Sequence, residues 1–357
     1  MLRTSSRAVP FTEQEIVMAA PAAAPPWLDD ADLAAQKYTE AVAEAVEKCA
    51  GDTKGQTCYI CTEALHWKTK EGLVRGCSCR GTSGVAHVSC LVEQAKILVA
   101  EAEENNLGNK VLNERFERWC ECSLCEQKYH GAVRCALGWA CWKTYVGRPE
   151  VDRTRASAMT QLGNGLSAAG HDEDAVSVYE AELSMQRRLG DSEDNIFAVQ
   201  GNLACVYAML ERLEEAMCLR KDVYYGWLKL KGGEHGMTLI AALNYANSLC
   251  GLERFEEAKS LLRKTIPVAQ GVLGKIHGNT LRMRFIYALA LCEDANATLD
   301  DLREAVTTLE NTERTARRVL GGAHPPAAAL RGPCKTREPR SPPARRRLHR
   351  RRRRACN

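Results

Sequence analysis

The segment NLACVYAMLERLEEA at residues 202–216 recurs 42 positions later as NYANSLCGLERFEEA at residues 244–258. Repetition at a fixed period of about 20 to 50 residues is typical of proteins built from stacked copies of one small unit. Each copy is interpreted as two antiparallel helices joined at the shared Glu-Arg turn. Small residues at matching positions, such as Ala216 and Ala258, allow the paired helices to approach closely. The fold is therefore expected to be mainly α, with an α-α helical solenoid.

The pattern extends in both directions from these two copies. Leu162-Gly163 aligns upstream at an offset of 41, and Tyr287-Ala288 aligns downstream at an offset of 42. These units resemble tetratricopeptide (TPR) repeats of the kinesin-light-chain type, which are longer than the usual unit of about 34 residues. The resemblance covers residues 156–325, as three full units and a partial fourth. It implies a concave groove that binds a peptide or a helix of a protein partner.

A histidine recurs near the end of each repeat, at His235, His277 and His324. The three lie on separate turns, 42 or 47 residues apart, so they would not converge on one metal ion. A hydrogen-bonding role within each turn is therefore favoured over metal binding.

A different pattern occupies residues 51–131, where cysteine and glycine are dense and apolar repeats are few. The candidate metal ligands form four ordered pairs within 68 residues: Cys58 and Cys61, Cys77 and Cys79, His87 and Cys90, Cys122 and Cys125. A tight turn that separates two ligands by one or two residues delivers both to one ion. Thiolate and imidazole favour zinc over harder cations. The expected cofactor is zinc, as two structural Zn²⁺ ions.

The order of these pairs resembles the RING-CH (RING-variant) family of zinc fingers over residues 55–131. Residues 77–82 match its C-x-C-R-G-[ST] segment, residues 87–91 its H-x-x-C-L, and residues 122–129 its C-x-L-C-x-x-x-Y. The resemblance implies a small, irregular α+β module with interleaved (cross-braced) ligation. One zinc ion would be held by Cys58, Cys61, His87 and Cys90, and the other by Cys77, Cys79, Cys122 and Cys125. Each ion then ties together segments that are distant in sequence.

Spacing separates this pattern from a PHD finger, which uses the same number of ligand pairs. Seven residues lie between Cys79 and His87, whereas a PHD finger usually keeps about four or five at that position. Eight ligands fill two sites. Cys120 is therefore expected to be a bystander, and His66, Trp67 and His130 are expected to pack or to lie at the surface.

The RING-CH resemblance implies a partner, and two functions remain open. In the family, a ubiquitin-conjugating enzyme docks on an apolar residue inside the first C-x2-C pair, which is Ile60 here. Docking also uses a Trp four residues after the sixth ligand, where this chain has Gln94. The first hypothesis is a ubiquitin-protein ligase that has no catalytic residue of its own and holds a protein in its repeats. The alternative is a non-enzymatic scaffold, or adaptor, that uses zinc only for folding.

Charge and hydropathy limit the partners and the cellular location that can be expected for this chain. The net charge is +4, but residues 331–357 contribute +11, so the rest of the chain sums to −7. This basic end has no Phe, Tyr or Trp for base stacking, so nucleic acid is not an expected partner. No stretch approaches the roughly 20 apolar residues of a membrane span, and the first residues lack a signal-peptide core. An intracellular, cytoplasmic protein with reduced thiols is expected, with nuclear import through the basic end as the alternative.

These observations together predict six consecutive parts. They are a disordered segment (1–28), a helix (29–50), the RING-CH zinc finger (51–131), a helical linker (132–155), the TPR repeats (156–325) and a basic disordered tail (326–357). The helical segment Val133–Tyr145 is expected to join the zinc finger to the repeats.

Overall fold

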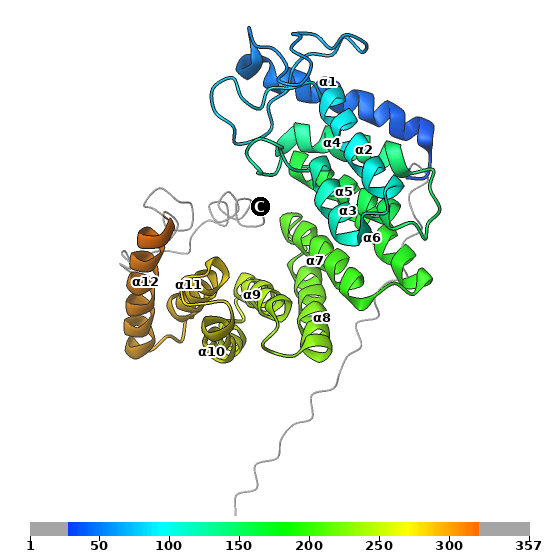
Figure 1. The fold of residues 1–357 in the computed structure, drawn as a ribbon. Helices are drawn as coiled ribbons and strands as arrows, with labels where there is room; N and C mark the ends of the chain where they lie inside the picture. Colours follow the sequence, from blue (N-terminus) through cyan, green and yellow to red (C-terminus); the bar gives the residue numbers. More distant parts are fainter. Residues whose placement is uncertain (1–27, 321–357) are drawn as a thin grey trace, which may run out of the picture.

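The computed structural model describes residues 28–320, and this range is mainly helical, as expected (Figure 1). It contains twelve α-helices and one short 3-10 helix but no named strand. Two isolated β-bridges, Val74 with Ala86 and Glu121 with Lys128, are the only sheet-like pairings in the described range. The disordered ends expected at residues 1–28 and 326–357 lie outside the described residues, except for Leu28.

The helices follow one another in this order: α1 Ala31–Thr53, α2 Val88–Glu104, α3 Gly108–Phe116, η1 Glu117–Trp119, α4 Gly131–Tyr145, α5 Arg153–Ala169, α6 Asp172–Leu189, α7 Glu193–Met209, α8 Leu213–Lys231, α9 Gly236–Gly251, α10 Phe255–Val272, α11 Gly278–Glu293 and α12 Leu299–Leu320. Helices α5 to α12 form four antiparallel hairpins that stack along an arc (Figure 1). None of the helices within residues 28–320 combines the length and the apolarity needed to cross a lipid bilayer.

The turn between the two helices of a repeat is the same in both copies of the quoted segment. Glu211 and Glu253 adopt left-handed backbone conformations, with φ of 64° and 60°. The next residues, Arg212 and Arg254, each donate a backbone hydrogen bond of 2.9 Å to a carbonyl five positions earlier. The small residues expected at the helix contacts are buried, at 0 or 1% exposure: Ala204, Ala216, Ala246 and Ala258. The repeated sequence therefore gives a repeated structure.

The recurring histidines begin the first helix of a repeat. The Nδ1 atom of His235 accepts a hydrogen bond from the backbone N–H of Met237 at 3.3 Å, and His277 does the same for Asn279 at 3.2 Å. These bonds satisfy backbone donors that a helix N-terminus leaves free. The expected turn role is thus observed for both residues, while His324 lies outside the described range.

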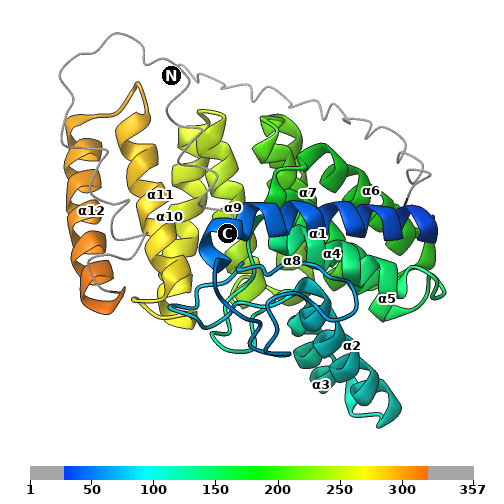
Figure 2. The same cartoon turned by 90° about the horizontal axis from the view of Figure 1, so that it is seen from above.

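Helix α4 falls in the segment predicted as a helical linker, residues 132–155, and most of its side chains are buried. It packs against both α1 and α5, so residues 54–130 form an insert between α1 and α4, two helices that contact each other (Figure 2). Two glycines allow the close α4–α5 contact. A Cβ at Gly138 would lie 2.9 Å from the carbonyl oxygen of Gln161, and one at Gly165 would lie 2.8 Å from that of Arg134. These two glycines therefore set how closely α4 and α5 pack.

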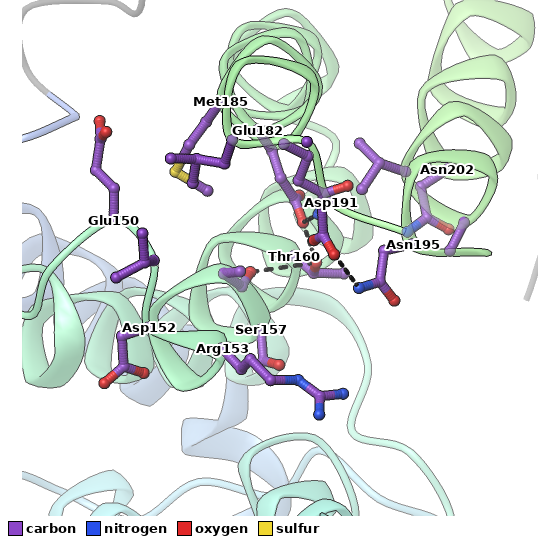
Figure 3. Close-up of a pocket in the computed structure, with 17 residues that line it drawn as sticks. Glu150, Asp152, Arg153, Ser157, Thr160, Glu182, Met185, Asp191, Asn195 and Asn202 are labelled. Carbon is purple, nitrogen blue, oxygen red and sulfur yellow. Dashed lines mark hydrogen bonds between the residues drawn. The ribbon is translucent and has the colours of Figure 1, made fainter. Parts of the chain in front are cut away.

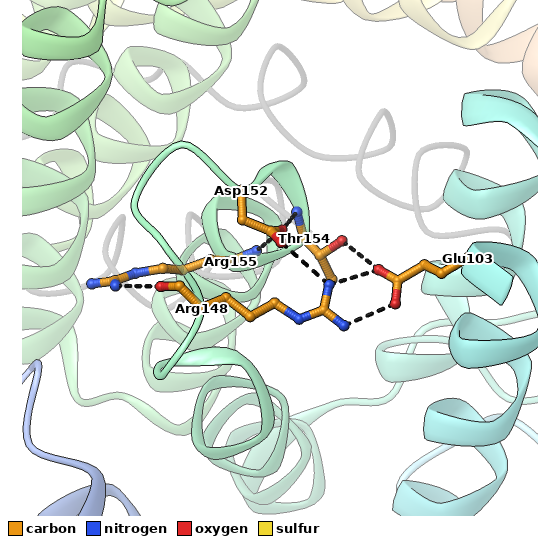
Figure 4. Close-up of polar contacts among 5 residues, drawn as sticks. All are labelled: Glu103, Arg148, Asp152, Thr154 and Arg155. Carbon is orange, nitrogen blue, oxygen red and sulfur yellow. Dashed lines mark hydrogen bonds and ion pairs between the residues drawn. The ribbon is translucent and has the colours of Figure 1, made fainter. Parts of the chain in front are cut away.

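A polar junction fixes the inserted segment to the start of the repeats (Figure 4). Arg148, just after α4, donates from both terminal nitrogens to the carboxylate of Glu103 on α2, at 2.7 and 2.8 Å. The hydroxyl of Thr154 on α5 donates to the same carboxylate at 3.1 Å. Two-point Arg–carboxylate contacts restrict orientation as well as distance. The junction therefore holds α2 in a defined position relative to α5.

Candidate metal centre

Two turns with the same backbone hydrogen bonds present the first and last cysteine pairs. The N–H of Cys58 donates to the carbonyl of Glu63 at 3.0 Å, and the N–H of Thr62 donates to the carbonyl of Cys58 at 2.9 Å. The turn that begins at Cys122 repeats both bonds, at 3.0 and 2.9 Å, with the residues five and four positions later. The fourth residue after the first cysteine has a positive φ in each case, 65° and 55°. In each turn, the two sulfur atoms of the pair lie within 4.8 Å of each other.

The structure brings all eight candidate ligands together in two groups of four. Within each group, the possible ligand atoms lie within 4.8 Å of one another. The groups are Cys58, Cys61, His87 and Cys90, and Cys77, Cys79, Cys122 and Cys125. Each group joins a turn to a segment far away in the sequence, and the two groups alternate along the chain. This is the interleaved arrangement that the RING-CH resemblance implies.

The distances between donor atoms fit tetrahedral zinc. With zinc–sulfur bonds of about 2.3 Å, the sulfurs at two corners of a tetrahedron lie about 3.8 Å apart, and a sulfur and a nitrogen about 3.5 Å apart. The Sγ atoms of Cys79 and Cys122 are 3.8 Å apart. The Nδ1 atom of His87 lies 3.3 Å from the Sγ of Cys61 and 3.7 Å from that of Cys90. The donor set and its spacing therefore suit the ion, and zinc binding itself stays a prediction.

Backbone amides also point at the sulfurs. The N–H of Ile60 donates to the Sγ of Cys58 at 3.4 Å, and the N–H of Leu124 donates to that of Cys122 at 3.5 Å. Such hydrogen bonds favour the thiolate form of a cysteine. Burial disfavours the thiolate and raises the pKa of the Cys77 thiol to about 11. Four thiolates in one group, two of them buried, would repel one another strongly without a cation. A bound metal ion would supply that charge and keep the ligands deprotonated.

Two further residues, Gly84 and Glu71, support the ligand groups but are not predicted by the ligand spacing. Gly84 has a φ of +76°, and a Cβ there would lie 2.8 Å from the Sγ of Cys77 and 2.6 Å from the Cβ of Cys79. Glu71 accepts hydrogen bonds from the backbone N–H and the hydroxyl of Ser89, at 2.7 and 2.8 Å, and so caps the start of α2. Because α2 carries Cys90, this cap helps to position a ligand. Neither residue belongs to the ligand pattern, so spacing alone gave no signal for them.

A third turn has the same backbone as the two cysteine turns but presents different side chains. His66 occupies the first position, with its N–H donating to the carbonyl of Glu71 at 3.0 Å. Lys70 donates back to His66 at 2.9 Å and has a φ of 59°. Thr69 stands where a second cysteine would be, and its hydroxyl lies 2.9 Å from the His66 Nδ1. Here a hydrogen bond occupies the inside of the turn.

The expected bystanders lie outside both groups of ligands. Cys120 is buried at 6% exposure, and burial raises the pKa of its thiol. His66 is buried and makes the hydrogen bond just described, whereas Trp67 beside it is 68% exposed. His130 is exposed and immediately precedes α4. The two groups that could hold a metal ion therefore consist of the eight residues chosen from the sequence.

The two cysteine turns present an exposed apolar surface beside the groups. Ile60 is 37% exposed, and Leu124, at the equivalent position of the other turn, is 52% exposed. The preceding residues, Tyr59 and Ser123, share a hydrogen bond of 3.1 Å between their hydroxyls, so the two turns are neighbours. Gln94, on α2, is only half-buried. The residue that the sequence indicated for docking, Ile60, is therefore accessible and has a second apolar residue on the adjoining turn.

Comparisons with known proteins bear on the helical array. Residues 238–279, from α9 to the start of α11, match the family model described as tetratricopeptide repeat. A solved structure of kinesin-light-chain TPR-like repeats from Podosopora anserina is 19% identical, covers 66% of this chain and 98% of its own, and has a TM-score of 0.44. BtubC (BKLC) from P. vanneervenii is 13% identical, covers 72% and 99%, and has a TM-score of 0.48. A search among curated proteins finds no match.

The helical hairpins and the family match together define the class of the array. It is a TPR-like solenoid, and repeats of this kind indicate binding of a protein partner. In the segment between α1 and α4, the structure shows two groups of Cys and His side chains that could hold a metal ion.

Proposed function

We propose that this chain is a zinc-binding RING-CH protein that acts as a ubiquitin-protein ligase, with the TPR-like array holding a protein substrate or adaptor. The observation that carries the proposal is the pair of interleaved Cys/His groups. In this division, residues 51–131 are the RING-CH module and residues 156–325 are the repeats. The module is inserted into the helical array between α1 and α4.

Two zinc ions would serve as cross-links. When bound, each ion would join a turn to a distant segment, which stabilises a region that has few regular hydrogen bonds of its own. The eight ligands named above would hold them, with Gly84 leaving room for the sulfurs of the second group. Structural zinc of this kind contributes on the order of 10 kcal/mol to folding.

Ubiquitin transfer would then rest on orientation. The apolar surface formed by Ile60 and Leu124 would dock a ubiquitin-conjugating enzyme, whose own cysteine carries the ubiquitin thioester. A module of this type forms and breaks no covalent bond. It holds the reacting groups in a productive arrangement, which lowers the entropic part of the barrier. The repeats would place the acceptor lysine of a bound protein within reach.

One residue favours the second candidate, a non-enzymatic scaffold. Gln94 stands where the RING-CH resemblance implies a Trp at the docking surface. A half-buried amide offers less apolar area than an indole, so docking of the conjugating enzyme would be weaker. In the scaffold, zinc would serve folding alone and the repeats would carry the function.

Autoubiquitination with a panel of conjugating enzymes tests the proposal. The native protein is compared with Ile60→Ala, Leu124→Ala and Cys58→Ser, and with Ile276→Ala as a matched control. Ile276 is also an exposed isoleucine, at 55%, but it lies in the loop between α10 and α11. We expect Ile60→Ala and Leu124→Ala each to slow transfer by about tenfold or more, as for anchor residues of an interface.

Each result separates the two candidates. Cys58→Ser should abolish transfer together with zinc binding, whereas Ile276→Ala should leave transfer unchanged. Native protein that binds two equivalents of zinc but is inactive with every conjugating enzyme would support the scaffold. Activity that survives both Ile60→Ala and Leu124→Ala would rule out this docking surface.

A further inference from the structure

A cavity of about 380 Å³ lies between the first repeat and the first helix of the second (Figure 3). Its walls come from three helices and the turn between α6 and α7. Thr160 of α5, Glu182 and Gln186 of α6, and Asn195 of α7 supply polar atoms, and Met185 and Val199 supply apolar wall. Cavities that bind small groups are commonly of this size and combine apolar walls with a few polar atoms.

Two buried oxygen atoms of residues that line this cavity have no hydrogen-bond partner. Glu182 is 1% exposed, and its Oε1 accepts from the hydroxyl of Thr160 at 2.5 Å and from the Nε2 of Gln186 at 3.2 Å. Its Oε2 is buried and unpaired, as is the Oε1 of Gln186, which is 4% exposed. Buried polar atoms in folded proteins almost always have a partner. When Glu182 is ionised, both unpaired atoms are acceptors, so the partner that suits them is a donor.

The charge of the cavity favours a cation. The Asp191 carboxylate, which accepts from the amide of Asn195 at 2.9 Å, lies close enough to raise the pKa of Glu182 further. Burial is the larger cause, and together they raise that pKa to about 8. Figure 3 shows both carboxylates facing the same space. A cation between them would remove their repulsion and keep Glu182 ionised.

The other charged groups around the cavity are at its rim. Glu150 is paired with Arg188 of α6 at 2.9 and 3.0 Å, and Asp152 caps the start of α5 through the backbone N–H of Thr154. Arg153 is exposed, and in Figure 3 its guanidinium points away from Glu182. No cationic side chain that lines the cavity therefore contacts the vacant acceptors.

We propose that this cavity binds the side-chain ammonium of a lysine in a protein partner, with Glu182 as its counter-ion. An ammonium group carries three donors on a narrow aliphatic stem. Glu182 Oε2, Gln186 Oε1 and the Asp191 carboxylate offer three acceptors, and the apolar wall suits the stem. The inference rests on the proposed function only in that the repeats bind a protein, and ubiquitin transfer plays no part in it.

The test uses the full-length, zinc-loaded chain and a defined probe, Nα-acetyl-lysine methylamide, in ligand-detected NMR titrations at millimolar concentration. The Nε-acetylated compound has the same backbone and stem without the charge, and pentylamine has the charge without the backbone. We expect the lysine compound to bind at least about tenfold more tightly than the acetylated one, the effect of losing one good charge contact. Pentylamine should bind more weakly than the lysine compound.

Two variants assign the site. Glu182→Gln keeps an acceptor for Thr160 but removes the charge, and it should weaken binding of the lysine compound by about tenfold. Glu173→Gln, an exposed residue on the same helix, should leave binding unchanged. Thermal unfolding shows that each variant is folded. Calorimetry in buffers of different ionisation enthalpy adds a second readout, because a protonated Glu182 must release its proton when the ammonium binds at pH 7.

The alternative outcomes are distinct. Equal binding of pentylamine and the lysine compound would overturn the lysine assignment in favour of a free amine. No binding of either compound would mean a water-filled cavity only. Binding that Glu182→Gln does not affect would place the probe elsewhere. A chain that binds the probe but lacks ligase activity would leave this site standing and contradict only the transfer function.

Discussion

The inserted segment between α1 and α4 and the helical array become rigid in different ways. In the array, each helix packs on the helix before it and the helix after it, so order comes from many similar local contacts. In the insert, much of the backbone is irregular, and two groups of four side chains join its distant parts. A change in the insert should therefore act on all of it at once. A change in the array should act locally.

Metal removal should produce the largest difference in stability between the two regions. In strong chelator, or with Cys122→Ala, we expect residues 54–130 to lose protection from proteolysis and hydrogen exchange, since zinc of this kind supplies on the order of 10 kcal/mol. Helices α5 to α12 should keep their helical circular dichroism. Cys218→Ser, at a free thiol on α8, is the matched control and should change little. An insert that stays protected without metal would show that metal ligation is not what makes it rigid.

Glu182→Gln should stabilise the array, by about 3 kcal/mol at pH 7. The pKa of this buried carboxyl is raised from 4.5 to about 8, so the folded state favours the protonated form. A raised pKa makes the native protein less stable as pH rises from about 4.5 to 8, by up to about 1.4 kcal/mol per pH unit. Glutamine removes this loss. Urea unfolding of the native protein, Glu182→Gln and Glu173→Gln across this pH window should show a gain for the first variant alone.

Two glycines in helices of the array should respond to alanine with opposite signs. Gly165→Ala places a methyl group 2.8 Å from the carbonyl oxygen of Arg134 on α4, which should destabilise the protein by about 2 kcal/mol. Gly201→Ala meets nothing within 4 Å and should stabilise α7 by about 0.5 to 1 kcal/mol. Chemical denaturation of both variants measures the difference. If both changes were stabilising, α4 would not pack on α5 as closely as described.

The junction of the two regions should give the smallest effect. Glu103→Gln removes the charge that faces Arg148 and should cost about 1 kcal/mol, because the pair is partly open to solvent. The Arg148 hydrogen bond lowers the pKa of Glu103. Its stabilisation is therefore present above the unfolded pKa of about 4.5 and is lost as pH falls below that value. Unfolding at pH 7 and at acid pH should show the difference only at pH 7, with the exposed neighbour changed in Glu104→Gln as a control.

Local patterns made much of this molecule predictable. The Glu-Arg turn, the buried alanines such as Ala216, and the capping histidines follow from residues near one another in sequence. The four ligand pairs were equally evident, because a turn sets the spacing of two ligands. In both regions, the signal lay within a few residues of the feature that it predicted.

Long-range packing could not be predicted in this way. The buried position of α4 depends on α1, which lies on the other side of the inserted segment. Gly138 and Gly165 matter only because the two helices approach each other there. The same holds for Gly84 beside the sulfurs, and for the turn at His66, which has the backbone of a ligand turn without its cysteines.

The sequence by itself determined the helical repeats and the identity of eight candidate ligands, because periodicity and ligand spacing are properties of short segments. Only the tertiary structure decided that the insert lies between two contacting helices, that Ile60 and Leu124 lie on neighbouring turns, and that Glu182 faces a cavity with an unpaired oxygen. These features arise where segments far apart in the chain meet. Their physical cause, mutual burial, is absent from any one segment alone.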